Sequence, residues 1–370
     1  MSPSIRQSVG DSTSMLVYDR VARHLNTILP AFHLEQYDAR IFETYRLMFE
    51  ESLRPPPKGA SPAFSRINSD GTPIQFSLPM GLGTVPLQFL GEAGSLGLPD
   101  AARREVSRRK ISSLAELLRV EKQLNLVSGL IDVSAGVNSL ELTPDHGGTF
   151  WVGASFSPEG SEALKIYING KGGSEIERWD RLDRFCLHFS ASPFWREMKE
   201  LVRTKMCPLG MAIDLRPNVR PSGRVYFRGY GNYVSFYEDL LRDCGGNSRA
   251  DAFSEYAEVM LGEDRKYPTQ SAVFSLGIRE DDRIDAKIEF SAHGLFRSDT
   301  QALNRCLQWL NLKNIEGNLY LQLLKLLSGE IDPHEVIVHS YLGLGWKGQQ
   351  EYTTMYLQPD LRSKGSTHEL

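Results

Sequence analysis

The sequence predicts an α+β fold in which ten antiparallel strands close into a barrel ringed by α-helices. Strand-like segments occur in five pairs, each joined by a turn, and helical patterns fill the connections between the pairs. A chain of alternating β and α units would instead show single strands between helices. Five hairpins that each need cover on their outer face are best satisfied by closure, because a closed barrel leaves no exposed sheet edge.

The third predicted hairpin shows the strand pattern most clearly. An apolar strand over residues 209–215 is followed by a Pro/Gly/Ser turn and by a strand that alternates Arg224 and Tyr226 with apolar residues. A basic residue returns in the equivalent position as Lys165 and as Lys287. This repetition indicates five units of the type ααββ. The predicted hairpins are 72–80 with 85–93, 149–156 with 163–169, 209–215 with the strand from 224, 271–280 with 284–293, and 335–347 with 350–359.

The predicted helices carry an apolar face with helical spacing. In residues 34–53 this face contains Tyr37, Ile41, Tyr45 and Met48, and a proline run at 55–57 ends the helix. One barrel domain is expected over residues 16–359, between a disordered N-terminus (1–15) and a flexible tail (360–370). The helical segments are 16–29, 34–53, 102–131, 175–206, 233–243, 250–261, 300–312 and 319–327.

Composition excludes several classes of function. A net charge of -4 argues against a nucleic-acid partner, and no apolar run is long enough for a membrane span, so a cytoplasmic protein is expected. The four cysteines are scattered, which disfavours a zinc site and indicates reduced thiols.

A ten-stranded barrel is too wide for its side chains to fill, so the lumen should hold a ligand. Its inward positions should then be polar or aromatic, and alternate positions of the second strands fit this expectation. These residues are Lys165, Tyr167, Arg224, Tyr226, Lys287, Glu289, Tyr352 and Tyr356.

Converging cations and phenols suggest an anionic ligand. Burying several cations together is costly unless an anion shares the space, and a diphosphate can accept charge-assisted hydrogen bonds from each of them. The sequence has no Gly-rich phosphate loop at a strand-to-helix turn and no DDxxD metal motif in a helical context. We therefore expect diphosphate binding without a metal or another cofactor.

Four segments in order resemble one family over about residues 34–359. They are TPIQFS, LKIYI, MAIDLRP followed by SGRVYF, and SYLGLGWKGQQEYTTMYLQP. Together they resemble the aromatic prenyltransferases of the dimethylallyltryptophan synthase type, which have the ABBA barrel fold. The resemblance implies an enzyme that binds an allylic diphosphate in the barrel and lets an electron-rich aromatic ring attack the allylic cation.

Carried over by position, the resemblance implies a set of residues for the diphosphate and for shielding the cation. Cations would stabilise the leaving diphosphate, and tyrosine faces would stabilise the carbocation and exclude water. This set is Lys165, Tyr167, Arg224, Tyr226, Lys287, Tyr341, Lys347, Tyr352 and Tyr356.

The acceptor side departs from the family. Gln75 replaces the acidic residue that orients an indole N–H, and its amide oxygen keeps the ability to accept a hydrogen bond. No lysine base is evident near Trp151, and Trp151 and His339 are candidate acceptor contacts. Pro86 and Ser222 stand where the family has arginines.

Glu289 is a further departure, because it stands where the family has a tyrosine. A lumen carboxylate opposes diphosphate binding. It could form a structural ion pair with Lys287 or Arg224, or accept the proton from the alkylated ring as a catalytic base.

Three functions follow from this lumen. The leading hypothesis is an aromatic prenyltransferase that moves a dimethylallyl or longer prenyl group onto an indole-type small molecule or peptide, as a monomer or homodimer. The alternative is a cyclase or isomerase that uses the same barrel on another anionic or prenylated metabolite. A non-catalytic binding protein is disfavoured, because buried cations without a ligand are costly.

Overall fold

The computed structural model describes most of the chain. Residues 1–11 and 361–370, which hold most of the predicted N-terminal and C-terminal tails, lie outside the described part. The described residues are 12–53, 65, 67–68, 71–94, 98, 100–135, 150–189, 194–231, 233–245, 247–262, 265–268, 271–278, 285–328 and 334–360.

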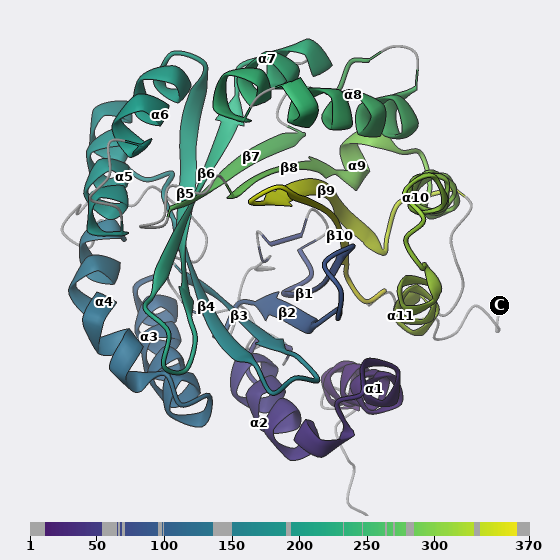
Figure 1. The fold of residues 1–370 in the computed structure, drawn as a ribbon. Coiled ribbons are helices and arrows are strands. Elements are labelled where there is room, and N and C mark those ends of the chain that lie inside the picture. The colour runs from purple at the N-terminus through teal and green to yellow at the C-terminus, as the bar shows by residue number, and fades with distance from the viewer. Residues whose placement is uncertain are drawn as a thin grey trace, which may run out of the picture.

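Ten antiparallel strands close into one barrel in the order β1-β10-β9-β8-β7-β6-β5-β4-β3-β2 (Figure 1). Each strand pairs with its neighbours in sequence, and β1 closes the ring against β10. The predicted ten-stranded antiparallel barrel is therefore confirmed. The strands are β1 (Ile74–Met80), β2 (Leu87–Gly91), β3 (Phe150–Phe156), β4 (Glu162–Asn169), β5 (Met206–Leu215), β6 (Ser222–Gly229), β7 (Ala272–Ile278), β8 (Asp285–Ser291), β9 (His339–Lys347) and β10 (Gln350–Leu357).

Helices surround the barrel, and two longer ones precede each hairpin in the chain (Figure 1). This order agrees with the predicted helical cover. The helices are α1 (Ser12–Ile28), α2 (Asp38–Phe49), α3 (Asp100–Leu117), α4 (Glu121–Ser134), α5 (Glu175–Phe189), α6 (Phe194–Arg203), α7 (Val234–Gly245), α8 (Asn247–Leu261), α9 (Ala292–Leu295), α10 (Asp299–Leu312) and α11 (Asn318–Ser328), with short 3-10 turns at Leu29–Phe32 and Glu35–Tyr37.

The continuous helical pattern predicted for residues 102–131 is two helices in the structure. Arg119 adopts a left-handed backbone conformation (φ 58°) between α3 and α4. The N–H of Val120 then donates to the carbonyl of Ala115 at 2.8 Å, which closes the end of α3. Apolar periodicity continues across this break, so it does not reveal the break in the sequence.

The hydrophobic core lies between the barrel wall and the helices. On β6, the outward side chains of Val225 and Phe227 are fully buried, and Phe227 stacks against Trp179 of α5 with ring centroids 6.0 Å apart. The intervening residues Arg224 and Tyr226 face the lumen. β6 is thus apolar on its outer face, which packs against the helices, and polar on its inner face.

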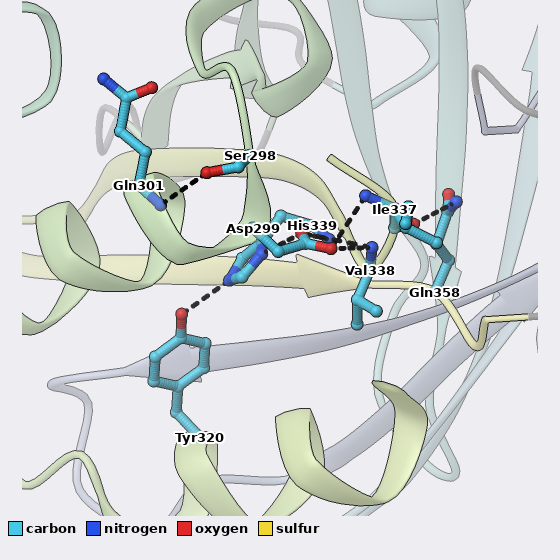
Figure 2. Close-up of polar contacts among 8 residues, drawn as sticks. All are labelled: Ser298, Asp299, Gln301, Tyr320, Ile337, Val338, His339 and Gln358. Atoms are coloured by element: carbon cyan, nitrogen blue, oxygen red, sulfur yellow. Dashed lines mark hydrogen bonds and ion pairs between the residues drawn. The ribbon is translucent and has the colours of Figure 1, made fainter. Parts of the chain in front are cut away.

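The last hairpin is anchored to α10 by one buried carboxylate (Figure 2). Asp299 accepts hydrogen bonds from the backbone N–H groups of Ile337 (2.9 Å), Val338 (3.0 Å) and His339 (3.1 Å). Its side chain also pairs with Nδ1 of His339 at 2.6 Å, and Nε2 of His339 lies 2.7 Å from the hydroxyl of Tyr320 on α11. The start of β9 is therefore fixed to two helices at once.

A β-bulge places His339 on the helix side of β9. Tyr356 pairs with Tyr341, but the next pair is Leu357 with His339, so Ser340 is an extra residue on β9. His339 thereby loses the alternation that would put it on the face of Tyr341. The prediction that His339 contacts an acceptor in the lumen is wrong, because its fully buried ring points to Asp299 and Tyr320.

We expect Asp299→Ala to lower the free energy of unfolding by about 3 kcal/mol, because it leaves His339 and three backbone donors buried without their acceptor. Urea denaturation would measure this loss. Asp239→Ala, which removes an exposed aspartate on α7, is the matched control and should change stability by less than about 0.5 kcal/mol.

The same carboxylate should contribute to acid unfolding. Burial alone would raise the pKa of Asp299, but the hydrogen bond and charge of His339 and the backbone donors lower it below its ordinary value. A group with a lowered folded-state pKa stabilises the fold above its unfolded pKa, and this contribution is lost as pH falls through the folded value. An equal acid sensitivity in Asp299→Ala and the wild type would contradict this assignment.

Candidate active site

The barrel contains a cavity of about 340 Å³ at the end where the hairpin turns lie. Lys347, at the end of β9, is exposed and also lines it. The second strands of four hairpins bring their predicted inward residues together on its wall. These are Lys165, Tyr167, Arg224, Tyr226, Lys287, Glu289, Tyr352 and Tyr356.

Small residues on the first strands make room for these long side chains. On adjacent strands of the sheet, Gly153 of β3 lies opposite Lys165 of β4, and Gly345 of β9 lies opposite Tyr352 of β10. A Cβ atom added at Gly345 would lie 2.5 Å from the ring of Tyr352, and one at Gly343 would lie 2.9 Å from Cε of Lys287. Glycine is required at these positions because a larger residue would fill the space that the polar side chains occupy.

Two of the cations in the cavity form ion pairs with carboxylates of β8. The guanidinium of Arg224 pairs with Asp285 and donates a hydrogen bond to Oγ of Ser275 at 3.0 Å. The Nζ atom of Lys287 lies 2.7 Å from Oε1 of Glu289. The predicted ion pair of Glu289 with Lys287 is thus present.

Tyr356 joins the second pair into a three-residue network. Its hydroxyl donates to Glu289 and accepts from Lys287. Burial would raise the pKa of Glu289, but the charge of Lys287 and the hydrogen bonds from Lys287 and Tyr356 lower it. Glu289 is therefore a carboxylate, with the charge that a proton acceptor needs.

Lys165 and Lys287 both have a pKa below that of free lysine. Burial lowers the pKa of Lys287 to about 8, although the charge of Glu289 opposes this effect. Burial and the charge of Arg224 lower the pKa of Lys165, while Asp214, Glu289 and Asp285 oppose that change. Arginine retains its charge when it is buried, so Arg224 is the most constant cation of the site.

Tyrosine rings form much of the remaining wall. The rings of Tyr167 and Tyr226 lie 6.1 Å apart between centroids, and Nζ of Lys165 lies 5.2 Å from the centroid of Tyr167. Nζ of Lys287 lies 4.5 Å from the centroid of Tyr356 and 5.9 Å from that of Tyr352. Burial raises the pKa of Tyr167, Tyr226 and Tyr356, so these side chains remain neutral phenols. Their faces can stabilise a cation by the cation–π interaction.

Three further predicted residues lie outside the lining of this cavity. Nε2 of Gln75 donates to Oδ1 of Asn68 at 2.9 Å and to Oγ of Ser340 at 2.7 Å, so both of its hydrogens are used within the protein. Trp151 pairs across the sheet with Tyr167, and Tyr341 makes an edge contact with Tyr356 at 6.3 Å. Trp151 and Tyr341 therefore lie next to tyrosines of the cavity wall. Their roles toward an acceptor stay predictions.

The sequence reasoning missed the two strand carboxylates Asp214 and Asp285 of the cavity, and also Glu159 in the turn between β3 and β4. Asp285 lies on the same face of β8 as Lys287 and Glu289, two and four residues before them. Asp214 on β5 lies opposite Lys165 on β4 in the strand register. The alternation that selected the inward cations would also have selected Asp214 and Asp285 had it been applied to acidic residues.

Two further features of the described residues concern metal binding and membrane insertion. Within the part of the chain that the structure describes, no group of three or more His, Cys, Asp and Glu side chains is placed to hold a metal ion. No helix in the described ranges is long and apolar enough to cross a membrane.

Known structures share this fold. The chain is similar to 6-dimethylallyltryptophan synthase from Micromonospora olivasterospora, with 14% identity over 93% of this chain and 98% of that one and a TM-score of 0.79. It is also similar to 5-dimethylallyl tryptophan synthase from Streptomyces coelicolor (17% identity, 98% and 99% covered, TM-score 0.78). AnaPT from Neosartorya fischeri matches with 12% identity over 97% and 96% and a TM-score of 0.71. The first two structures contain DMASPP and tryptophan.

Sequence comparison adds nothing to this result. No protein-family model matches the chain, and no curated protein matches it. At 12% to 17% identity the structural likeness establishes the fold, which is that of the aromatic prenyltransferases of the dimethylallyltryptophan synthase type. The fold implied by the sequence resemblance is confirmed.

The lowered pKa of Lys287 predicts pH-dependent anion binding. We expect the affinity for inorganic diphosphate to fall as pH rises through about 8, because Lys287 then loses its charge. Calorimetric titration between about pH 7 and about pH 9.5 would measure this. Lys287→Arg keeps a cation throughout this range and should lack the step, while the ionisation of the ligand affects both proteins equally. The same step in both proteins would exclude Lys287 as its source.

Proposed function

We propose that this protein is an aromatic prenyltransferase, which moves a dimethylallyl or longer prenyl group from its diphosphate to an aromatic acceptor inside the barrel. The observation that carries this proposal is the cavity, where cations and neutral tyrosine rings share one enclosed wall. The fold supports it, because the similar structures named above are dimethylallyltryptophan synthases. The expected acceptor is an indole, such as tryptophan or a tryptophan-containing peptide.

In the first step the C–O bond of the donor breaks, and its electron pair leaves with the diphosphate. Lys165, Arg224 and Lys287 would stabilise the charge on the departing oxygens. The allylic cation left behind would lie against the rings of Tyr167 and Tyr226, which attract it and exclude water. This assignment uses neutral tyrosines, in agreement with their raised pKa values.

In the second step the aromatic ring attacks the cation and a new bond to the prenyl carbon forms. The alkylated ring must then lose a proton to regain aromaticity. Glu289 is an ionised carboxylate on the cavity wall and is the base that we assign to this proton. Both N–H groups of Gln75 are used within the protein, so only its amide oxygen could orient the acceptor, which would then have to extend beyond the residues that line the cavity.

A second function is favoured by the ion pairs. Asp285 and Glu289 neutralise two of the cations that would hold a diphosphate. A barrel with such a lumen could instead act as a cyclase or isomerase on a less highly charged, prenylated metabolite. In that case the tyrosine wall would still stabilise a cationic intermediate, and no diphosphate would be released.

Activity without a metal, a cytoplasmic location and a monomeric or dimeric state remain part of the proposal. Metal independence is supported by the cations of the cavity, which can take the place of a divalent ion on the diphosphate. Turnover that is unchanged by EDTA would support it. Size-exclusion chromatography with light scattering would give the oligomeric state.

We expect the wild type to release diphosphate from dimethylallyl or geranyl diphosphate only when an aromatic acceptor is present. Arg224→Gln should lower kcat/KM about 100-fold, because it removes a charge that stabilises the leaving group. Diphosphate release and mass spectrometry of the product would measure both, with tryptophan, tryptamine, indole and phenols as acceptors. Arg242→Gln, an exposed site on α7, is the matched control. Absence of turnover with every pair of donor and acceptor would contradict prenyl transfer.

Tyr226→Leu should separate shielding from binding. We expect about a tenfold loss of kcat, the effect of one desolvated cation–π contact, together with a larger share of free prenyl alcohol from attack by water. Product analysis by chromatography would give the ratio of alcohol to prenylated acceptor. Tyr230→Leu removes a nearby tyrosine that is 58% exposed and should leave the ratio unchanged. An unchanged ratio in Tyr226→Leu would remove Tyr226 from the shield.

A further inference from the structure

The cavity is close to neutral before any ligand is considered. Among the described residues of its wall, five cations face four carboxylates: Lys165, Arg216, Arg224, Lys287 and Lys347 against Glu159, Asp214, Asp285 and Glu289. Two buried cations make direct ion pairs, Arg224 with Asp285 and Lys287 with Glu289, and the more exposed Arg216 pairs with Asp214. A diphosphate that approached these cations would meet carboxylates of its own sign within the same few ångströms.

The surroundings of the two ion pairs leave room for a ligand anion to replace Asp285 or Glu289 as the partner of the cation. Both carboxylates lie on β8, and each is next to a glycine on one neighbouring strand, Asp285 next to Gly277 of β7 and Glu289 next to Gly343 of β9, while Val273 of β7 is the other neighbour of Glu289. At these two positions the neighbouring glycine places no side chain beside the carboxylate. Tyr356 donates to Glu289, so this carboxylate can keep a hydrogen-bond partner after Lys287 turns to a ligand.

We propose that Asp285 and Glu289 are internal counter-ions, which a diphosphate displaces from Arg224 and Lys287 when it binds, and that they determine how tightly the cavity holds its donor. The inference rests on the proposed function, since it concerns the donor site. Each carboxylate lowers the cost of burying its cation in the protein and competes with the phosphate oxygens for the same donors. Their removal should therefore strengthen donor binding, although both residues line the site.

The exchange also links donor binding to the proton acceptor. While Glu289 is paired with Lys287, its charge is neutralised and its basicity is low. A phosphate oxygen that takes Lys287 leaves Glu289 as a carboxylate held by Tyr356 alone among these partners. The base is then released in the same event that positions the leaving group.

Asp285→Asn tests the exchange most directly, because Arg224 keeps its charge without its partner. Glu289→Gln is less direct, since Lys287 could then lose its proton. We expect Asp285→Asn to bind inorganic diphosphate and dimethylallyl thiolodiphosphate about tenfold more tightly than the wild type, a change of about 1.4 kcal/mol. Isothermal titration calorimetry near pH 7 would measure both ligands.

Glu159→Gln is the matched control. It removes a carboxylate from the wall of the same cavity, where Glu159 accepts a hydrogen bond from Thr84 at 2.7 Å. The charge of the cavity then changes equally, but no cation loses its counter-ion, so an increase of less than about twofold is expected. Asp285→Ser serves as a second variant if Asp285→Asn does not fold, as judged by thermal denaturation.

The outcomes separate the inference from the proposed function. Tighter binding in Asp285→Asn but not in Glu159→Gln supports the counter-ion role. Unchanged or weaker binding in Asp285→Asn, or an equal gain in the control, overturns this role and leaves prenyl transfer standing. Absence of diphosphate binding in the wild type and in every variant overturns the proposed function itself.

Discussion

Closure of the barrel by β1 against β10 is the constraint on which the rest of the structure depends. This pairing joins residues 76–80 to residues 353–357, near opposite ends of the chain, and it fixes the two faces of every strand between them. A side chain that points inward on one strand then meets inward side chains from all others. Lys165 and Tyr356 can lie in one cavity only because the ring is closed.

Closure creates an electrostatic problem that the sequence solves locally. Long cationic side chains in a confined space of low polarity are unfavourable unless they have partners. The partners come from the same sheet: β8 contributes Asp285, Lys287 and Glu289 on one face, and Tyr356 bridges to Glu289 from β10. Glycines on the neighbouring strands provide the space for this arrangement. The paired cations are thus stable in the folded protein. They also remain hydrogen-bond donors for an anion that binds them more strongly than the carboxylates do.

Much of this could be predicted from the sequence, because alternation along a strand directly states which side chains share a face. The ten strands, the helical cover and eight residues of the cavity wall followed from it. His339 did not, since one extra residue at Ser340 reverses the alternation and bulges leave no reliable sign in a single sequence. The break at Arg119 was missed for a similar reason, because a left-handed residue interrupts a helix without interrupting its apolar face. The pairing of Arg224 with Asp285 depends on side chains that are 61 residues apart, and strand register decides it.

Two buried networks of this protein use the same kinds of side chain for opposite purposes. Asp299, His339 and Tyr320 form a carboxylate–imidazole–phenol chain whose order resembles a proton relay (Figure 2). Its carboxylate is saturated by backbone N–H groups, and its imidazole is fully buried between β9 and two helices, so no substrate can reach it. Lys287, Glu289 and Tyr356 are bound to one another just as closely, but they form part of a cavity wall. Chemical type alone therefore does not distinguish an anchor from a reactive site. Access does, and in this fold access is decided by which side of the barrel a strand residue faces.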